Sequence, residues 1–267
     1  MISHLASPLR NLVSTLILFI SISPIHAQSH LSSTPSSITQ YRVEVTTEFP
    51  IHLGLSALLE LNHGLRLQSS IGWMPSHYVQ VTNDIVQQII PDAYPPETAK
   101  LVEDTIRNSL VWTIKGGWRP FENSGFYINL GYTLAALGGG STAKGLIEGI
   151  TGVSTEDRSY NTASNYRERK ELPIDAAASL HFAAFDLGWE WSLVKYKSKQ
   201  ELILRTALGF SYTFTSSAKL TAQSDDPRPR YQEALRRLES AGEDYLVETF
   251  GSYIHPPSFT IALGYTF

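Results

Sequence analysis

The side chains best placed for catalysis are a serine and a histidine two residues apart. Ser179 and His181 lie in a run of alanine, leucine and phenylalanine, and Glu171 and Asp175 precede them. Residues two apart share one face of a strand, and a serine beside a histidine can form a hydrolytic dyad. The chain has no G-x-S-x-G nucleophile elbow. We therefore keep a serine hydrolase as an alternative and assign no catalytic residue.

Thiol, metal and phosphate chemistry have no basis in the sequence. The chain contains no cysteine, which excludes disulfides, thiol catalysis, thiolate metal sites and a lipoprotein anchor. His52, His63 and His255 are single and far apart, without the spacing of a metal site. The three glycines at 138–140 lack the lysine signature of a phosphate-binding loop, and we interpret them as a flexible exit from a strand. We predict no cofactor and no metal.

Composition narrows the class of protein. The 267-residue chain has a net charge of −4, and only 17% of its residues are charged, against about a quarter in soluble proteins. No basic patch favours a nucleic-acid partner. Aromatic residues make up 11%, with 13 tyrosines and 5 tryptophans, which suits either a sandwich core or the aromatic girdles of a membrane barrel.

The first residues are typical of an export signal. Arg10 supplies positive charge, residues 12–22 are apolar, Pro24 breaks the run, and Ala27 offers a small residue for cleavage. We predict a signal peptide over 1–27, since the apolar run is shorter than the roughly 18 residues that span a bilayer. An uncleaved anchor is the alternative.

The remainder is predicted to be β-structure. Residues 28–40 are polar and serine-rich, which favours a flexible lead-in. From Tyr41 onward, apolar and polar residues alternate with the period of two that indicates strands. The alternating runs cover residues 41–61, 65–75, 109–120, 126–137, 176–194, 200–215 and 257–267.

The strand count depends on the first run. It is twice the length needed to cross a membrane, and Pro50 within it cannot donate a hydrogen bond to a sheet. A turn near 48–50 would give eight strands in all. However, the alternation continues across Pro50, so one long strand is the alternative, with the eighth strand hidden elsewhere.

Short and long connections alternate along the chain. The long ones are 80–108, 139–172 and 216–255, and outer-membrane barrels have short periplasmic turns and long outer loops. Helical spacing indicates helices at 97–107, at 142–150 and between Tyr231 and Tyr245. Each has an apolar face that needs cover, so we expect these helices to pack on the barrel mouth or on one another, as a lid or plug.

Alternation alone fits both a soluble sandwich and a membrane barrel, and the last strand favours the barrel. Its apolar face ends on an aromatic residue and consists of Phe259, Ile261, Leu263, Tyr265 and Phe267. In this the chain resembles bacterial outer-membrane β-barrel proteins, whose closing strand ends in this way and is read by the barrel-assembly machinery. The resemblance implies an all-β, antiparallel up-and-down transmembrane β-barrel over 41–267, with short helices in its long loops.

The polar faces of the strands then line the barrel interior. A barrel of about eight strands is filled by side chains, so no open channel is expected. We predict a network of both charge signs there, formed by Arg66, Lys115, Arg119, Asp186, Glu190, Glu201 and Arg205. Such groups need partners, which favours a rigid structural core over a polar conduit or a small ligand site.

The tryptophans all lie on apolar strand faces. An aromatic girdle is predicted from Trp73, Trp118, Trp189 and Trp191, whereas Trp112 lies on a similar face. Trp118, Trp189 and Trp191 are near predicted short turns, as a periplasmic-side girdle would be.

These observations predict a monomeric outer-membrane barrel with a structural, surface-interaction or limited-permeation role. Its partners would be outer-membrane lipid and the barrel-assembly machinery. Two alternatives remain: an outer-membrane lipid hydrolase or acyltransferase, and a soluble periplasmic β-barrel that binds a small apolar ligand.

Overall fold

The computed structural model describes residues 40–89, 94–106, 108–121, 124–151, 172–197, 200–224 and 228–267. The predicted signal peptide (1–27) and nearly all of the predicted lead-in (28–40) lie outside the described residues. None of the described helices has both the length and the hydrophobicity to cross a bilayer.

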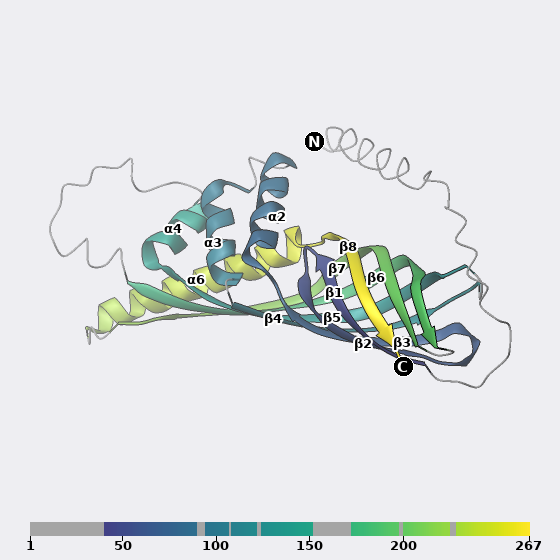
Figure 1. Cartoon of the computed structure of the whole chain (residues 1–267). Coiled ribbons are helices and arrows are strands. Elements are labelled where there is room, and N and C mark those ends of the chain that lie inside the picture. Colours follow the sequence, from purple (N-terminus) through teal and green to yellow (C-terminus); the bar gives the residue numbers. More distant parts are fainter. Residues whose placement is uncertain are drawn as a thin grey trace. The chain divides into compact units, whose positions relative to one another are not determined.

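Eight antiparallel strands close into a barrel (Figure 1). Each strand pairs with its neighbours in the sequence, and the first pairs with the last through Arg42 and Thr266. The prediction of an all-β up-and-down barrel of eight strands is therefore confirmed. The strands are β1 (Gln40–Phe49), β2 (His52–Glu60), β3 (Leu65–Trp73), β4 (Asn108–Trp118), β5 (Phe126–Thr142), β6 (Pro173–Lys197), β7 (Gln200–Ala222) and β8 (Pro257–Thr266).

The first alternating run divides into β1 and β2, as the turn at Pro50 predicted. Pro50 and Ile51 form the turn, and the Phe49–Pro50 peptide bond is cis. The register pairs Glu48 with His52, so even-numbered residues face inward on both strands. The alternation therefore keeps its phase through the turn, which is why the sequence pattern shows no break there.

In the described parts of the connections, four α-helices and one short 3-10 turn join the strands. The predicted helices at 97–107, at 142–150 and from Tyr231 are confirmed, whereas the helix at the start of the first long connection was not predicted. That helix is rich in β-branched valine, isoleucine and threonine, which favour strands. The helices are η1 (Asn62–Gly64), α2 (Ser76–Ile89), α3 (Pro96–Ile106), α4 (Ala143–Thr151) and α6 (Pro229–Tyr253).

Strands β5, β6 and β7 extend well beyond the closed barrel, and we call residues 135–142, 173–182 and 215–222 the sheet extension. The glycines at 138–140 lie inside β5 and pair with Asp175, Ala176 and Ala177 of β6. Their interpretation as a flexible exit was wrong. Glycine has no side chain and alanine has only a methyl group, so the sequence shows no alternation of apolar and polar residues here. The backbone pairing of β5 with β6 continues through these residues.

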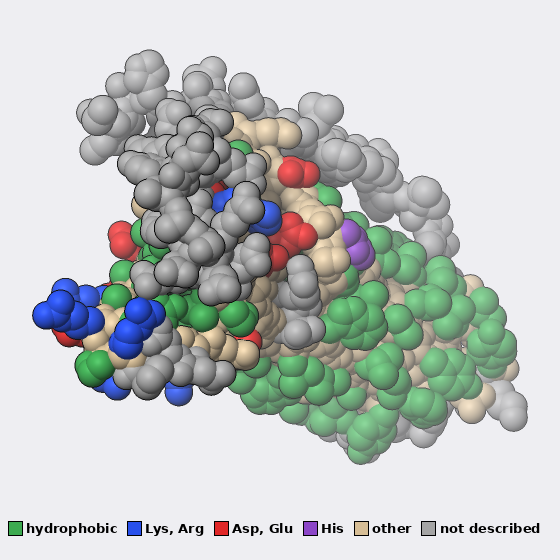
Figure 2. Space-filling view, turned by 90° about the vertical axis from the view of Figure 1, so that its left-hand side faces the viewer, with side chains coloured by type: hydrophobic (Ala, Val, Ile, Leu, Met, Phe, Trp, Pro, Cys, Tyr) green, Lys and Arg blue, Asp and Glu red, His purple; other side chains and the backbone are tan. Residues whose placement is uncertain are grey.

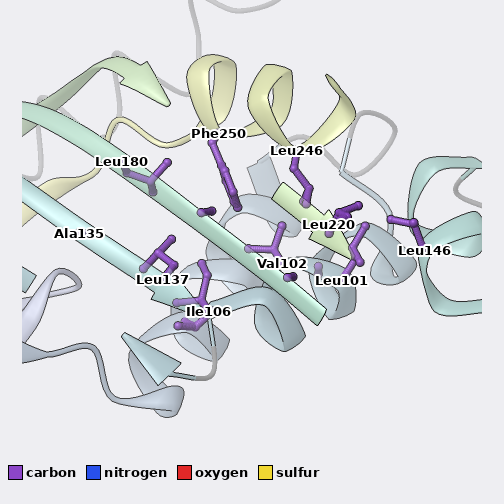
Figure 3. Packing of buried hydrophobic residues seen from close by; sticks show 14 of the residues in the cluster. Leu101, Val102, Ile106, Ala135, Leu137, Leu146, Leu180, Leu220, Leu246 and Phe250 are labelled. Atoms are coloured by element: carbon purple, nitrogen blue, oxygen red, sulfur yellow. The ribbon is translucent and has the colours of Figure 1, made fainter. Parts of the chain in front are cut away.

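The hydrophobic core lies outside the barrel, between the sheet extension and the helices. We call α2, α3, α4 and α6 the helical cap. Leu246 and Phe250 of α6 point toward the strands that carry Leu180 and Leu220 (Figure 3). Leu101, Val102 and Ile106 of α3, Leu146 of α4, and Ala135 and Leu137 of β5 complete this cluster. The buried apolar faces of α3, α4 and α6, the helices predicted from the sequence, are thus covered by the sheet and by one another, as expected.

Along each long strand, the polarity of the two faces reverses at the mouth of the barrel. On β6, the inward face carries Asp186 within the barrel and Leu180 beyond it, both buried. The outward face carries Phe185 on the barrel and Asp175 on the extension, both exposed. The strand is therefore polar inside and apolar outside in the barrel, and the opposite beyond it.

A β-bulge marks this boundary on β7. Phe182 pairs with Thr213 and His181 pairs with Thr215, so Phe214 is the extra residue. A bulge shifts which residues face each side. Odd-numbered residues face inward before it, as Arg205 does, and even-numbered ones after it, as Leu220 does. The shift brings Leu220 into the core under α6.

Removing a buried side chain from this core is expected to loosen the cap and leave the barrel intact. Phe250→Ala should lower the stability of the cap by about 3–5 kcal/mol, since it leaves a cavity under α6. Limited proteolysis of the protein in detergent should then cleave the helices faster, whereas the exposed control Arg236→Ala should cleave like the wild type. Loss of the barrel together with the helices would contradict a separate core.

Candidate functional site

The barrel interior, which we call the lumen, is filled with charged side chains. Each is carried at an inward position of its strand and is buried or nearly so. Of the residues predicted for a lumen network, the structure brings together Arg66, Lys115, Arg119, Asp186, Glu190 and Arg205. Lys115 pairs with Asp186 and with Glu48 of β1. The other four connect through residues of β1, β2 and β5 that were not in the predicted set.

Glu190 on β6 is the carboxylate with the most arginine partners among the described residues. Its oxygens lie 2.7 Å from Arg42 Nη1, 2.5 Å from Arg66 Nη2 and 2.5 Å from Arg119 Nη2. Arg119 also lies 3.3 Å from Glu60. Charge-assisted hydrogen bonds of this length are the strong ones. Glu190 therefore ties β1, β3 and the end of β4 to β6 across the lumen.

Glu44 on β1 holds a second group of contacts. Its Oε2 accepts hydrogen bonds from Arg205 Nη2 at 2.7 Å and from Ser56 Oγ at 3.0 Å, and its Oε1 lies 3.2 Å from Arg42 Nη1. Arg42 thus links this group to Glu190. Arg205 in turn donates from Nη1 to the phenol oxygen of Tyr127 at 3.2 Å.

Tyr127 of β5 gives the network an aromatic centre. The guanidinium of Arg66 lies 4.1 Å from the centre of its ring, a cation–π contact. No room is left beside it, since a methyl group on Gly188 would overlap the Tyr127 ring. The tyrosine ring is therefore packed between the Arg66 guanidinium and the backbone of β6 at Gly188.

Lys115 on β4 forms a third group, nearer the cap. Its ammonium lies 2.9 Å from both carboxylate oxygens of Glu48 and 2.8 Å from Asp186 Oδ2. All of these groups are almost fully buried. A buried ammonium without partners is strongly disfavoured, and here two carboxylates surround it.

The network is balanced in charge. Its cations are Arg42, Arg66, Lys115, Arg119 and Arg205, and its carboxylates are Glu44, Glu48, Glu60, Asp186 and Glu190. Equal numbers of each sign leave the lumen without net formal charge. A solute of about the lumen's width would have to break several buried ion pairs to cross it.

Sequence reasoning missed several members, although a signal for them existed. Arg42, Glu44, Glu48 and Glu60 stand on the polar face of the first alternating run, which placed them inside as soon as that run was assigned to the wall. Tyr127 alternates with the outward apolar residues of β5 and so had to face inward.

Glu201 is the one predicted member that the structure does not bring into the network. It pairs with Lys195 at 3.3 Å, and the two side chains are 19% and 47% exposed. Both lie where the short β6–β7 connection leaves the barrel. Glu201 has the inward parity of β7 but lies too near the end of the strand to reach the lumen charges.

Ser179 and His181 lie on the outward face of the sheet extension. Ser179 Oγ is 3.5 Å from His181 Nε2, a long contact, and 2.9 Å from Ser217 Oγ. His181 Nδ1 lies 2.6 Å from Tyr132 Oη. His181 could accept a proton from Ser179 only in the tautomer that donates Nδ1–H to the tyrosine.

No acidic residue of the described chain completes this pair. Asp175 accepts a hydrogen bond from Gln223 at 2.5 Å, and Glu171 lies outside the described residues. The described residues contain no group of three metal-ligating side chains. His52 is buried at the start of β2, His63 lies in η1, and His255 stacks on Tyr212.

The outer wall of the barrel, meaning its outward-facing side chains, carries exposed apolar residues on all eight strands. Figure 2 shows a broad apolar surface on one side of the barrel. Trp118, Trp189 and Trp191 lie toward the end with the short β4–β5 and β6–β7 connections, whereas Trp73 and Trp112 lie toward the cap. The predicted assembly signal lies on the outward face of β8 and on the residue after it: Phe259, Ile261, Leu263 and Phe267 are exposed, and Tyr265 is half-buried.

Comparison with solved structures finds matches of low similarity, among them two proteins of one bacterium. Crystal structures of Acinetobacter baumannii CarO and CarO2 are 12% and 13% identical to this chain, with TM-scores of 0.34 and 0.33. They cover 85% and 86% of this chain and 97% and 98% of their own. No family model and no curated protein matches the sequence. We draw no conclusion about function from similarity this low.

Neutralising Glu190 should destabilise the barrel far more than neutralising Glu201. Glu190→Gln leaves buried arginines short of a counter-charge and should lower the free energy of unfolding by about 3–5 kcal/mol. Glu201→Gln removes a half-exposed pair and should change it by about 0–1 kcal/mol. Urea unfolding in lipid vesicles, followed by tryptophan fluorescence, measures both. Equal effects would show that the network does not hold the barrel.

Proposed function

We propose that this protein is an integral outer-membrane β-barrel with a closed lumen, which holds the helical cap at the cell surface. Its role is structural or in surface interaction, with limited permeation at most, and we assign it no catalysis. The proposal rests on the distribution of polarity: apolar side chains cover the outer wall, and charged side chains fill the lumen.

The outer wall supports a lipid environment. Val45, Leu55, Leu130 and Phe210 are about half exposed or more, and exposed apolar side chains recur on every strand of the barrel. A soluble monomer rarely exposes an apolar patch larger than a few hundred Å². A soluble barrel that binds an apolar ligand would need the opposite arrangement, with the apolar faces turned inward.

Strand length and the polarity reversal support the same assignment. β1 and β8 have 10 residues each, and a tilted transmembrane strand needs about 9–11. On β7 the exposed apolar side chains continue to Phe214, four residues past its last pair with β8 at Phe210. Polar side chains follow at Ser217 and at its β6 partner Ser179. The apolar belt thus has the height of one bilayer and a polar border on the cap side.

Connection lengths support an orientation in which the helical cap lies outside the cell and the opposite end of the barrel lies in the periplasm. The β2–β3, β4–β5 and β6–β7 connections are short and lie at the end where β1 begins and β8 ends. The long connections with their helices lie at the other end, together with the short Pro50 turn. Bacterial barrels keep short turns in the periplasm and long loops outside. The export signal predicted over 1–27 and the closing strand β8 would serve secretion and assembly.

The closed lumen supports a role at the surface in place of transport. Glu190, Lys115 and Tyr127 hold buried contacts at successive levels of the barrel. The contact between Ser179 and His181 is long, at 3.5 Å, and no acidic residue completes the pair among the described residues. We therefore propose that the cap, and not the lumen or a serine nucleophile, carries the function.

A charge placed on the outer wall should block membrane insertion, whereas the same charge beyond the boundary should not. Phe185 and Ala177 lie on the same outward face of β6, below and above the reversal of polarity. Phe185→Arg should cost about 2–4 kcal/mol in the bilayer, and Ala177→Arg close to nothing. The measurement is the fraction recovered in outer membranes after density separation. Equal recovery, or wild-type protein in the soluble fraction, would refute the assignment.

The intact barrel should conduct poorly. In planar lipid bilayers, purified protein is expected to give no steady ohmic steps, because Lys115 and Glu190 keep their partners in the lumen. A larger barrel with an open lumen, reconstituted in the same way, is the positive control. Steady steps of uniform size from the wild type would assign a pore.

A further inference from the structure

Helix α2 (Ser76–Ile89) packs one face against the rest of the helical cap and leaves another face uncovered. Val79 and Asn83 are buried. Asn83 donates to the carbonyl of Ala99 in α3 and accepts from the phenol of Tyr94, both at 2.9 Å. Burial raises the pKa of Tyr94, since a phenolate there would lose its hydration, so this donor stays protonated. One face of α2 is therefore fixed to the cap by polar contacts.

A different face of α2 is an exposed apolar stripe. Val81, Ile85 and Ile89 are spaced four residues apart, which places them in a row along the helix. Their exposed fractions are 43%, 46% and 53%. Asp84 and Gln88, three and seven residues after Val81, flank the stripe on its solvent side, away from Ile89, and are also exposed. α2 thus keeps an amphipathic pattern on the part of its surface that the cap does not cover.

The stripe begins on the outer wall of the barrel. Tyr78, one turn before Val81 on the same side of α2, lies 2.5 Å from Thr47 Oγ1 through its phenol oxygen. The Tyr78 ring meets the ring of Phe49 edge-on at 5.1 Å. Thr47 and Phe49 are outward-facing residues at the cap end of β1. The apolar row of α2 therefore continues the lipid-facing surface past the end of the strand.

The course of α2 agrees with this. It runs across the direction of α6 and of the long strands (Figure 1), and α6 lies along β7. Transmembrane strands are tilted by about 35–45° from the membrane normal, so a helix that crosses them at the barrel mouth lies closer to the membrane plane than to the normal. Such a helix turns one whole side, and not one end, toward the lipid.

We propose that α2 is a membrane-surface helix, whose Val81, Ile85 and Ile89 lie in the apolar part of the outer-leaflet interface. The inference rests on the proposed membrane location. Lipid is the occupant that fits, because the stripe is continuous with the lipid-facing wall at Tyr78. The helix carries no lysine or arginine, and its single acidic residue, Asp84, is off the stripe. The stripe can therefore enter the lipid without removing a charge from water.

The helix would then fix the cap relative to the membrane. Its Asn83 side holds α3 and its Ile85 side holds the lipid surface, so a cap that tilted would have to break one of the two contacts. The interface would supply a lateral support that the closed barrel alone does not provide.

The chain has no cysteine, so a single introduced cysteine gives a unique labelling site. Nitroxide labels at Ile85→Cys, Asp84→Cys and Val45→Cys would be compared in the full-length protein, reconstituted in phosphatidylcholine–phosphatidylglycerol vesicles. Accessibility to oxygen, which concentrates in lipid, and to a water-soluble nickel chelate is read by electron paramagnetic resonance. All three positions are exposed, so none of the labels replaces a packed side chain.

The inference expects the label at residue 85 to shift toward the oxygen-accessible, nickel-protected values at residue 45, and the label at residue 84 to stay nickel-accessible. Nickel access at both 84 and 85, with protection at 45, would overturn the α2 inference alone. Nickel access at 45 would overturn the membrane location itself. Spin–spin broadening at 85 with protection from both reagents would assign the stripe to a second copy of the chain, and that too would overturn the lipid assignment.

Discussion

A charged side chain inside a closed barrel must meet its counter-charge within that barrel, and this constraint governs the structure. Glu190 on β6 reaches Arg42 on β1 and Arg66 on β3, strands that are not its neighbours in the sheet. A slip of one residue in any of these strands would turn the charge to the outer wall. The pairing of charges across the lumen therefore fixes the register that the backbone ladder alone leaves free.

Beyond the barrel mouth, the inward faces of β5, β6 and β7 are apolar and no longer charged. Once β5, β6 and β7 pass the ends of β1 and β8, their inward face meets the helical cap in place of the lumen. Leu180 and Leu220 take the positions that Asp186 and Arg205 hold lower down. The bulge at Phe214 adjusts the phase of β7 where this happens. One continuous strand can thus serve two environments, since only its side chains change.

The sequence pattern predicted the strands of the barrel, but it did not predict the sheet extension or helix α2. A period of two predicted the strands, and Pro50 predicted the division of the first run. Alternation tells which face a residue occupies but not its height along the strand, so Glu201 was placed in a network that it does not reach. The glycines at 138–140 and the β-branched residues of α2 hid elements whose stability comes from packing against α3, β5 and β6.

Charge pairing also determines where this protein can interact with anything else. Opening the lumen would leave Lys115 or the arginines around Glu190 without partners in a water-poor space, which is strongly unfavourable. The outer wall is committed to an apolar environment by its composition. The helical cap and the polar outward face of the sheet extension, which carries Asp175 and Ser179, are the surfaces that can change partner without cost to the barrel. Evolution of a new binding activity in this architecture would therefore act on the connections after β3, β5 and β7 and leave the lumen residues as they are.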